Sequence, residues 1–223
     1  MSEPTLLVDN SIEGQPVSQS SQRLLWLDNL ERSCVVLFLL QMLVRLGWSS
    51  LHNGDVSALV TIPGEIMVVV FLLLRRSTEL ISTRPVDWIV AFLATVLPTL
   101  VVPTQGVPRI WAPLCAGLAV VGLIVQLHAK ICLGRSFGMV AANRGIKRGG
   151  PYQFVRHPMY AGYLMGHIAF LGLFPSLWNL CLIVVAAAIQ LNRILREERI
   201  LGQDPAYQEY MQVVKYRLVP GLF

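Results

Sequence analysis

A series of long apolar runs constrains this chain more than any other feature. A helix that crosses the hydrocarbon core of a bilayer needs about 20 predominantly apolar residues, and several runs approach that length. Of the 223 residues, 54% are hydrophobic and only 14% are charged, whereas an ordinary soluble domain carries about 25% charged residues. Backbone groups in lipid are satisfied only within helices or closed barrels, and these runs are continuous, not alternating. The sequence therefore predicts an all-α, polytopic integral membrane protein.

The apolar pattern predicts about five to six transmembrane helices. The runs in chain order are residues 33–50, 56–74, 86–102, 110–131, 158–174 and 177–201. Pro98 interrupts the third run near its end, because proline cannot donate the helical hydrogen bond. Arg45 and Glu65 lie inside the first two runs, where an ionisable residue indicates either a functional site or a structural pair. A short link joins these two runs, which favours a pair.

The segments outside the runs suggest three parts of the chain. Residues 1–22 are polar and lack the basic and apolar regions of a signal peptide, so we predict a disordered tail. Residues 23–32 are amphipathic and are predicted to lie on the membrane surface. The three predicted parts are the tail with this surface helix (1–32), the N-terminal transmembrane helices (33–132), and a core of loop, helical hairpin and C-terminal segment (133–223).

The placement of lysine and arginine predicts the orientation. Basic residues gather in the segments after the second, fourth and sixth runs, whereas Arg109 is the basic residue of the links on the other side. Cytoplasmic segments carry this excess, so both termini and the polar segment 134–156 are predicted to be cytoplasmic. The formal net charge of +5 has the same explanation and indicates no nucleic-acid partner.

Motifs for metal, disulfide or nucleotide chemistry are absent from the sequence. The four cysteines lie in apolar segments without CxxC or Cys/His spacing, which predicts neither a metal site nor a disulfide framework. They are Cys34, Cys115, Cys132 and Cys181. No HExxH, GxSxG, Walker or GxGxxG motif occurs, so a soluble-type nucleotide domain is not supported.

The densest polar cluster is Gly149–Gly162, between two apolar runs. Pro158 suits the first turn of a helix, since the N–H that it lacks would have no partner there. The helix N-terminus after Arg156 favours a carboxylate or phosphate ligand, although a basic flank and a helix start would also explain these residue types. Gly162 and Gly166 have the small-xxx-small spacing that permits close helix packing.

A second polar cluster, residues 193–199, follows one hairpin later. Arg193 and Glu197 are four residues apart and share a helix face. Both signs of charge directly after a membrane span suit a zwitterionic ligand, while a surface ion pair is the alternative. The predicted topology brings both clusters to the cytoplasmic ends of neighbouring helices, and so predicts one site. His128 and His167 are interpreted as satisfied helix residues.

Together these motifs resemble the isoprenylcysteine carboxyl methyltransferase family, a broad group that also includes membrane phospholipid N-methyltransferases. The resemblance is carried by Gly150-Pro151-Tyr152, by Arg156-His157-Pro158-Met159-Tyr160-Ala161-Gly162, by Glu197-Glu198 and by Tyr207-x-x-Tyr210. It covers about residues 133–223, and the earlier spans match only as generic apolar helices. The loop between residues 137 and 152 is shorter than in the eukaryotic members, and residues 202–205 also depart from the family pattern.

The resemblance implies S-adenosylmethionine as cofactor, and no metal, in a cytoplasmic pocket formed by the C-terminal half. The implied cofactor-binding residues are Arg144, Gly145, Ile146, Lys147, Tyr152, His157, Pro158, Met159, Tyr160 and Glu197. Arg193 is the implied substrate-facing residue, with Arg156 as a weaker candidate, and Glu197 is expected to serve both cofactor and catalysis.

The implied reaction is methyl transfer to a lipophilic acceptor that enters from the bilayer. A carboxylate acceptor, such as a prenylcysteine-type carboxyl, is favoured and needs no general base, so positioning and desolvation suffice. A phospholipid amine or a small thiol is the alternative acceptor, and an amine would first lose a proton to Glu197, Glu198 or His157. A transporter or scaffold is the non-enzymatic alternative, although only Glu65 lies clearly at the midplane, where a transporter would need polar residues.

Overall fold

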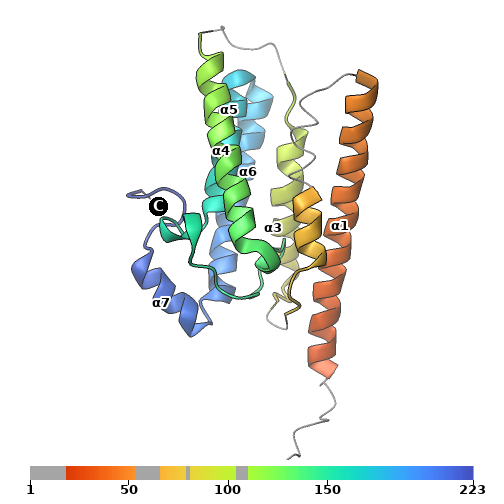
Figure 1. Cartoon of the computed structure of the whole chain (residues 1–223), viewed down its shortest axis with the longest axis vertical. Coiled ribbons are helices and arrows are strands. Elements are labelled where there is room, and N and C mark those ends of the chain that lie inside the picture. The colour runs from red at the N-terminus through yellow and green to blue at the C-terminus, as the bar shows by residue number, and fades with distance from the viewer. Residues whose placement is uncertain (1–18, 54–65, 79–80, 104–109, 223) are drawn as a thin grey trace, which may run out of the picture.

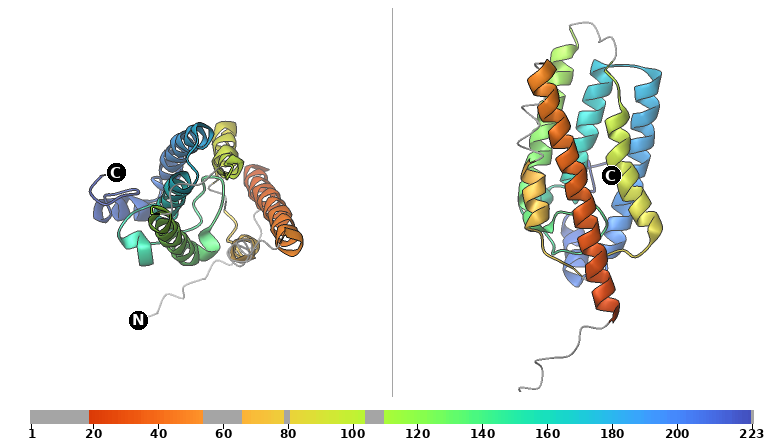
Figure 2. Two further views of the ribbon diagram at one scale, coloured as in Figure 1. Left: turned by 90° about the horizontal axis from the view of Figure 1, so that it is seen from above. Right: turned by 90° about the vertical axis from the view of Figure 1, so that its right-hand side faces the viewer.

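The computed structural model describes residues 19–53, 66–78, 81–103 and 110–222. Within these ranges the chain is helical, and its only bridge between extended residues joins Ile81 to Ala142. Figure 1 shows the long helices running along the long axis of the molecule, and the left view of Figure 2 shows the same helices from above. The all-α prediction is confirmed.

Helices α3 to α6 keep to the predicted apolar runs with small shifts. The α-helices are α1 (Gln19–Asn53), a stretch at residues 66–73, α3 (Pro85–Val96), α4 (Ala112–Leu133), α5 (Pro158–Leu173), α6 (Leu177–Leu201) and α7 (Pro205–Val213). The 3₁₀ turns are η1 (Leu97–Leu100), η2 (Gly134–Ser136) and η3 (Gly150–Gln153). The third run tightens into η1 at Pro98, where the sequence predicted an interruption.

Helix α1 differs from the prediction, because the surface helix and the first span form one continuous helix. It also includes residues 19–22, which were predicted to belong to the disordered tail. Asp28 and Glu31 are fully buried against the rest of the protein, so this part of α1 packs inward. The rest of the predicted tail and Glu65 lie outside the described residues, and so does the side chain of Arg45. Their predicted pairing therefore stays a prediction.

Two of the described helical segments are long and apolar enough to cross a membrane. They are Ala112–Ser136 and Leu177–Leu201, and only 17% and 22% of their most apolar windows are buried within the protein. Large apolar side chains such as Ile124 and Val184 are exposed instead. An apolar surface of this extent is unfavourable in water and favourable in lipid. The fold is that of a membrane protein.

Helices α4 and α5 pack closely along one another because both present glycine at the contact. A Cβ atom on Gly162 would lie 2.7 Å from the carbonyl oxygen of Gly122, and one on Gly122 would lie 2.9 Å from that of Gly162. Gly166 has more room, since its nearest neighbour would lie at 3.9 Å. Close helix packing is thus confirmed for Gly162, and the partner glycine is on α4.

The polar segments meet at one end of the helices, the lower end in Figure 1. The loop after residues 66–73 contacts the loop before α5, since Arg76 N–H donates to the Arg135 carbonyl and Ser82 N–H donates to that of Ala141, each at 3.0 Å. Asp87 at the start of α3 pairs with Arg196 near the end of α6. The candidate site lies at this end.

Candidate active site

The start of α5 is fixed by the C-terminal segment of the chain. Pro158 occupies the first turn, as predicted. The N–H groups of Arg156 and His157 donate to the carbonyl oxygens of Tyr216 and Arg217, each at 2.9 Å. These bonds give partners to backbone groups just outside the helix, and they hold the Arg-His-Pro motif against residues 214–218.

Gly150 and two tyrosines shape the turn before the motif. Gly150 has φ +60°, and a Cβ there would lie 2.6 Å from Cys132 Sγ, so only glycine fits without displacement. The Tyr210 hydroxyl donates to the carbonyl of Tyr152 at 2.6 Å. Burial raises the pKa of Tyr152 above its ordinary value and that of Tyr210 to about 12, so both hydroxyls stay neutral near pH 7.

Glu197 faces the motif across the α5–α6 hairpin. The Tyr160 hydroxyl donates to Glu197 Oε2 at 2.7 Å, and the Arg193 guanidinium carbon lies 5.3 Å from the centroid of the Tyr160 ring. No cation forms an ion pair with Glu197 within the described part of the chain. Its carboxylate is therefore available to a positively charged or hydroxyl-bearing ligand.

Glu198 instead binds three side chains of the protein itself. It accepts from Arg156 Nε at 2.8 Å and Arg217 Nε at 2.8 Å, and it lies 3.2 Å from His157 Nε2. Arg156 also donates to the carbonyl of Val214 at 3.2 Å. Arg156, the weaker candidate for a substrate-facing role, is thus occupied by contacts that join α5, α6 and the C-terminal segment.

A buried ion cluster holds the loop before the motif. Arg144 Nη2 lies 2.8 Å from Asp28 Oδ1 and 2.9 Å from Glu31 Oε2, and Arg75 pairs with the same two carboxylates. The two arginines and the two acids balance in charge. Their attraction offsets part of the free energy that is lost when the four charges are removed from water. The cluster joins α1, the loop after residues 66–73 and the candidate cofactor loop.

Met139, in the same loop, is held from both sides. Its N–H donates to Glu31 Oε1 at 2.5 Å, while its carbonyl accepts from Arg193 Nη2 at 2.7 Å. Val140 N–H also donates to Glu31 Oε1, at 3.0 Å. The loop is therefore positioned between α1 and α6, and one arm of Arg193 is used for this purpose.

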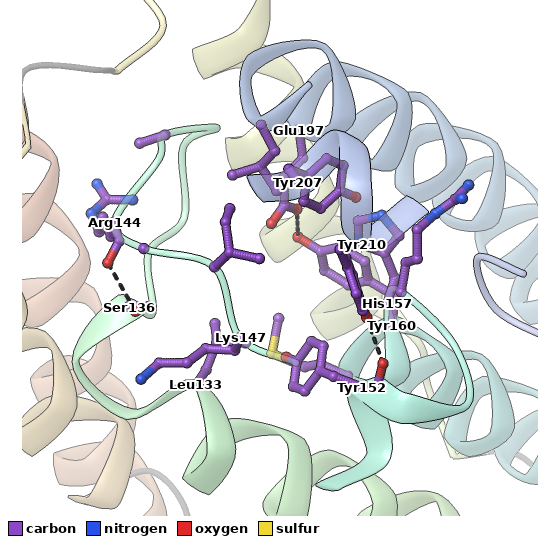
Figure 3. A pocket seen from close by; sticks show the side chains of 16 residues that line it. Leu133, Ser136, Arg144, Lys147, Tyr152, His157, Tyr160, Glu197, Tyr207 and Tyr210 are labelled. Carbon is purple, nitrogen blue, oxygen red and sulfur yellow. Dashed lines mark hydrogen bonds between the residues drawn. The ribbon is translucent and has the colours of Figure 1, made fainter. Parts of the chain in front are cut away.

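The motif, the loop and Glu197 converge on one small pocket, shown in Figure 3. Its volume is about 70 Å³. It brings together nine of the ten residues predicted to bind the cofactor, namely Arg144, Gly145, Ile146, Lys147, Tyr152, His157, Met159, Tyr160 and Glu197. Pro158 does not line it, although Arg156 does. The Tyr207 hydroxyl, also at this pocket, is buried with no hydrogen-bond partner in the described structure.

Arg193 lines a second and larger cavity of about 260 Å³, which we call the chamber. Its walls come from α1, residues 66–73, α3, η1, α4, α5, α6 and the loop, and they are largely apolar. Met159 lines both the pocket and the chamber. Lys130, on α4, is buried beside the chamber with its ammonium nitrogen 5.6 Å from the centroid of the Tyr163 ring. No acid pairs with Lys130 among the described residues.

Several residues at these cavities were not singled out by the sequence. The Tyr207-x-x-Tyr210 spacing was noticed, but its helical i, i+3 relation alone did not show that both rings line the pocket. Asp28 and Glu31 looked like surface charges on an amphipathic helix. His167, interpreted as a satisfied helix residue, lines the chamber, and no hydrogen bond or ion pair to another described residue is found for it. The positions of these side chains depend on how the helices pack, so the sequence alone did not indicate them.

Fold and site together define a helical membrane protein with a pocket lined by charged side chains and tyrosines at one end and a largely apolar chamber beside it. Residues 115–203 match the sequence model of the isoprenylcysteine carboxyl methyltransferase (ICMT) family. The part of the chain that carries most of the candidate site is thus similar in sequence to this family of methyltransferases. The first 114 residues lie outside the match.

The comparisons with curated proteins and with solved structures add less about this chain. No curated protein matches the chain. Among solved structures, the chain is similar to one titled "Structure of the eukaryotic intramembrane Ras methyltransferase ICMT (isoprenylcysteine carboxyl methyltransferase) without a monobody", with 13% identity and a TM-score of 0.46. The alignment covers 91% of this chain and 94% of that one.

Proposed function

We propose that this protein is a membrane-embedded, S-adenosylmethionine-dependent methyltransferase that acts on a lipophilic carboxylate. The observation that carries the proposal is that Met159 lines both cavities: a pocket that Arg144, Lys147 and Glu197 also line, and a larger chamber with mostly apolar walls. A methyltransferase for a lipid must bring a polar cofactor and an apolar acceptor together at one point. We further propose that the protein is multi-pass, with both termini and the pocket facing the cytoplasm.

The residues of the pocket fit this cofactor chemically. The ligand carries a carboxylate, an ammonium, a sulfonium and ribose hydroxyls, so it needs partners of both signs and a hydroxyl. Among the described residues, the Glu197 carboxylate has no ion pair and the buried Tyr207 hydroxyl has no hydrogen-bond partner. Lys147 is exposed at the pocket. The enclosed volume is below the roughly 300 Å³ of a typical ligand pocket, so the exposed Gly145 and Lys147 would hold part of the ligand at the open side.

When bound, S-adenosylmethionine supplies a methyl group on a positively charged sulfur, and a carboxylate can accept that methyl group without losing a proton. The protein contributes position and exclusion of water. Tyr160 orients Glu197 through its hydroxyl, while Met159 separates the polar and apolar compartments. Glu198 holds His157 and Arg156 in place, so His157 is not a free general base, and an acceptor that is already anionic needs none.

The charges at the chamber favour a carboxylate over an amine. Arg193 and Lys130 both line it, and no acidic side chain pairs with Lys130 in the described ranges. Two cations attract an anion and repel an ammonium group. A phospholipid amine is therefore the less favoured acceptor, and a thiol is not specifically favoured by any contact.

The first test is binding of S-adenosylmethionine to the full chain in lipid nanodiscs, measured by isothermal titration. Saturable binding supports the enzyme, while folded protein without binding would leave a scaffold or transporter as the better explanation. The second test is transfer of a labelled methyl group into a total lipid extract and into an S-prenylcysteine analogue. Alkali releases labelled methanol from a methyl ester only, so stable label would instead indicate an amine or thiol acceptor.

Arg193→Ala separates acceptor binding from cofactor binding. We expect methyl transfer to fall at least about tenfold, because a hydrogen bond to a charged group contributes about 1.5–3 kcal/mol. Binding of the cofactor should be largely kept. Lys130→Ala is the companion variant. A drop in cofactor affinity without a change in methyl transfer would show that these two cations bind the cofactor and not the acceptor.

A further inference from the structure

A third cavity, which shares no lining residue with the pocket or the chamber, lies between the first turns of α1, the start of α3 and the end of α6. Its volume is about 250 Å³. Leu24, Ile81 and Ile200 form an apolar part of its wall, and two arginines, Arg84 and Arg199, also line it. We call it the basic cavity.

The two arginines of the basic cavity have no acidic partner in the described part of the chain. Neither an ion pair nor a side-chain hydrogen bond is found there for Arg84 or Arg199. Asp87, the acid of the cavity, already pairs with Arg196 and accepts from the Ser82 hydroxyl. Two like charges at one cavity repel each other, and an anion between them removes this repulsion. Guanidinium groups suit phosphate in particular, because they can donate two parallel hydrogen bonds to it.

The exposed side chains of α6 place Arg199 at the edge of the membrane. Val184, Leu191 and Leu195 are exposed and lie on one face, since seven residues make about two helical turns and four make about one. Arg199 is four residues after Leu195, is also exposed, and ends this apolar face. Apolar side chains on the surface of a membrane helix face the acyl chains, so the arginine that follows them lies at the level of the lipid headgroups.

Arg84 has the matching position at the start of α3. It is exposed and directly precedes the helix, whose Val86 and Ile89 are exposed apolar side chains. The ion pair of Asp87 with α6 joins the start of α3 to the end of α6. A phospholipid whose chains contact these apolar side chains would therefore bring its phosphate to Arg84 and Arg199.

We propose that the basic cavity binds the phosphate of an anionic membrane phospholipid through Arg84 and Arg199. The exposed Thr83 hydroxyl and Gln203 amide can supply further hydrogen bonds to the headgroup. A zwitterionic lipid also carries an ammonium group, which two arginines repel, so a headgroup with net negative charge is favoured. The cavity includes no residue of the candidate cofactor or acceptor sites, so the inference stands apart from the proposed function.

The test measures thermal unfolding of the full chain, without cofactor, in nanodiscs of phosphatidylcholine alone and of phosphatidylcholine mixed with phosphatidylglycerol. A ligand that binds only the folded protein raises the unfolding midpoint, so we expect phosphatidylglycerol to raise it. Each variant is compared with itself in the two lipids, so that a change in its own stability cancels.

Arg84→Gln and Arg199→Gln should each weaken this effect, and the double variant should abolish it. Titrating the fraction of phosphatidylglycerol gives an apparent dissociation constant, which should rise at least about tenfold in each single variant, the factor for losing a hydrogen bond to a charged group. Lys215→Gln is the matched control, because it removes one exposed positive charge from the C-terminal segment. It should keep the full rise in the midpoint.

Inorganic phosphate added to the phosphatidylcholine nanodiscs separates a lipid from a free anion. A higher midpoint with phosphate but not with phosphatidylglycerol would show that the cavity binds a free anion, and would overturn the inference. No rise with either would overturn it as well. A rise with phosphatidylglycerol that persists in the double variant, or that is lost equally in Lys215→Gln, would show a general effect of membrane charge and no site at these arginines.

Discussion

At the scale of single residues, Glu197 and Glu198 are neighbours in sequence with different surroundings. Glu197 receives one hydrogen bond, from Tyr160, and otherwise faces the pocket. Glu198 is surrounded by Arg156, His157 and Arg217. Consecutive residues of a helix point about 100° apart, so one reaches the ligand side and the other reaches the C-terminal segment.

Glu197→Gln should weaken cofactor binding and leave the fold intact. The variant keeps the side chain's size and an acceptor for Tyr160, but it loses the charge that would meet an ammonium group. We expect the dissociation constant for S-adenosylmethionine to rise about 10-fold to 100-fold, from about 1.5–3 kcal/mol for a charged hydrogen bond. Isothermal titration measures this change. An unchanged constant would remove Glu197 from the proposed site.

Glu198→Gln should mainly lower the stability of the fold, whereas Glu197→Gln should mainly weaken cofactor binding. Glu198→Gln leaves two arginines without their carboxylate, and breaking a buried pair costs about 3 kcal/mol or more. We expect a clear drop in the midpoint of thermal unfolding, measured for both variants in the same lipid nanodiscs. If Glu198→Gln melted like the unmodified protein while Glu197→Gln did not, the two roles would have to be exchanged.

At the scale of elements, the contact between α4 and α5 depends on one glycine pair. Gly162→Ala would place a methyl group 2.7 Å from the Gly122 carbonyl, so the helices must separate. We expect a loss of about 1–3 kcal/mol from overpacking. Gly166→Ala is the matched control, since it has 3.9 Å of room and alanine favours a helix. Thermal unfolding should rank Gly162→Ala below Gly166→Ala, and the reverse order would contradict the packing argument.

Helix α1 contributes to the site through its buried acids. Glu31→Gln retains an acceptor for Met139 N–H but leaves Arg75 and Arg144 with less negative charge, so we expect a destabilisation of about 3 kcal/mol. Arg32→Gln is the control. Arg32 lies 3.8 Å from Asp28 with a partly exposed side chain, and such pairs contribute about 0–1 kcal/mol. Its bonds to the Arg75 carbonyl and the Ser77 hydroxyl are long, at 3.3 Å each. Chemical unfolding that showed equal losses would mean that the cluster does not hold the loop.

At the scale of the whole molecule, the polar loops, the first part of α1 and α7 share one end of the helices, whereas the exposed apolar side chains lie along them. The proposed orientation puts this end in the cytoplasm. A green fluorescent protein fused after residue 223 should fluoresce in a bacterial inner membrane, and alkaline phosphatase fused there should be inactive, because each folds on only one side. The reverse result would place the pocket on the other side.

The sequence by itself determined the features that depend on local chemistry. Apolar run length predicted the long apolar helices α4 and α6, Pro158 predicted the start of α5, and the run ending at residue 201 predicted the end of α6. The motif residues were also found from sequence, because their order along the chain is part of the signal.

Tertiary structure alone decided what depends on how helix faces meet. The rotation of α6 sends Glu197 to the pocket and Glu198 to Arg156, and it directs Arg193 to a different cavity from Arg156. Helix α1 packs against the rest of the protein so closely that Asp28 and Glu31, which the sequence suggested were surface charges, are buried in an ion cluster. The meeting of α4, α5 and α6 around one chamber gave Gln190 its place, because a side chain's partners depend on neighbours that are distant in sequence.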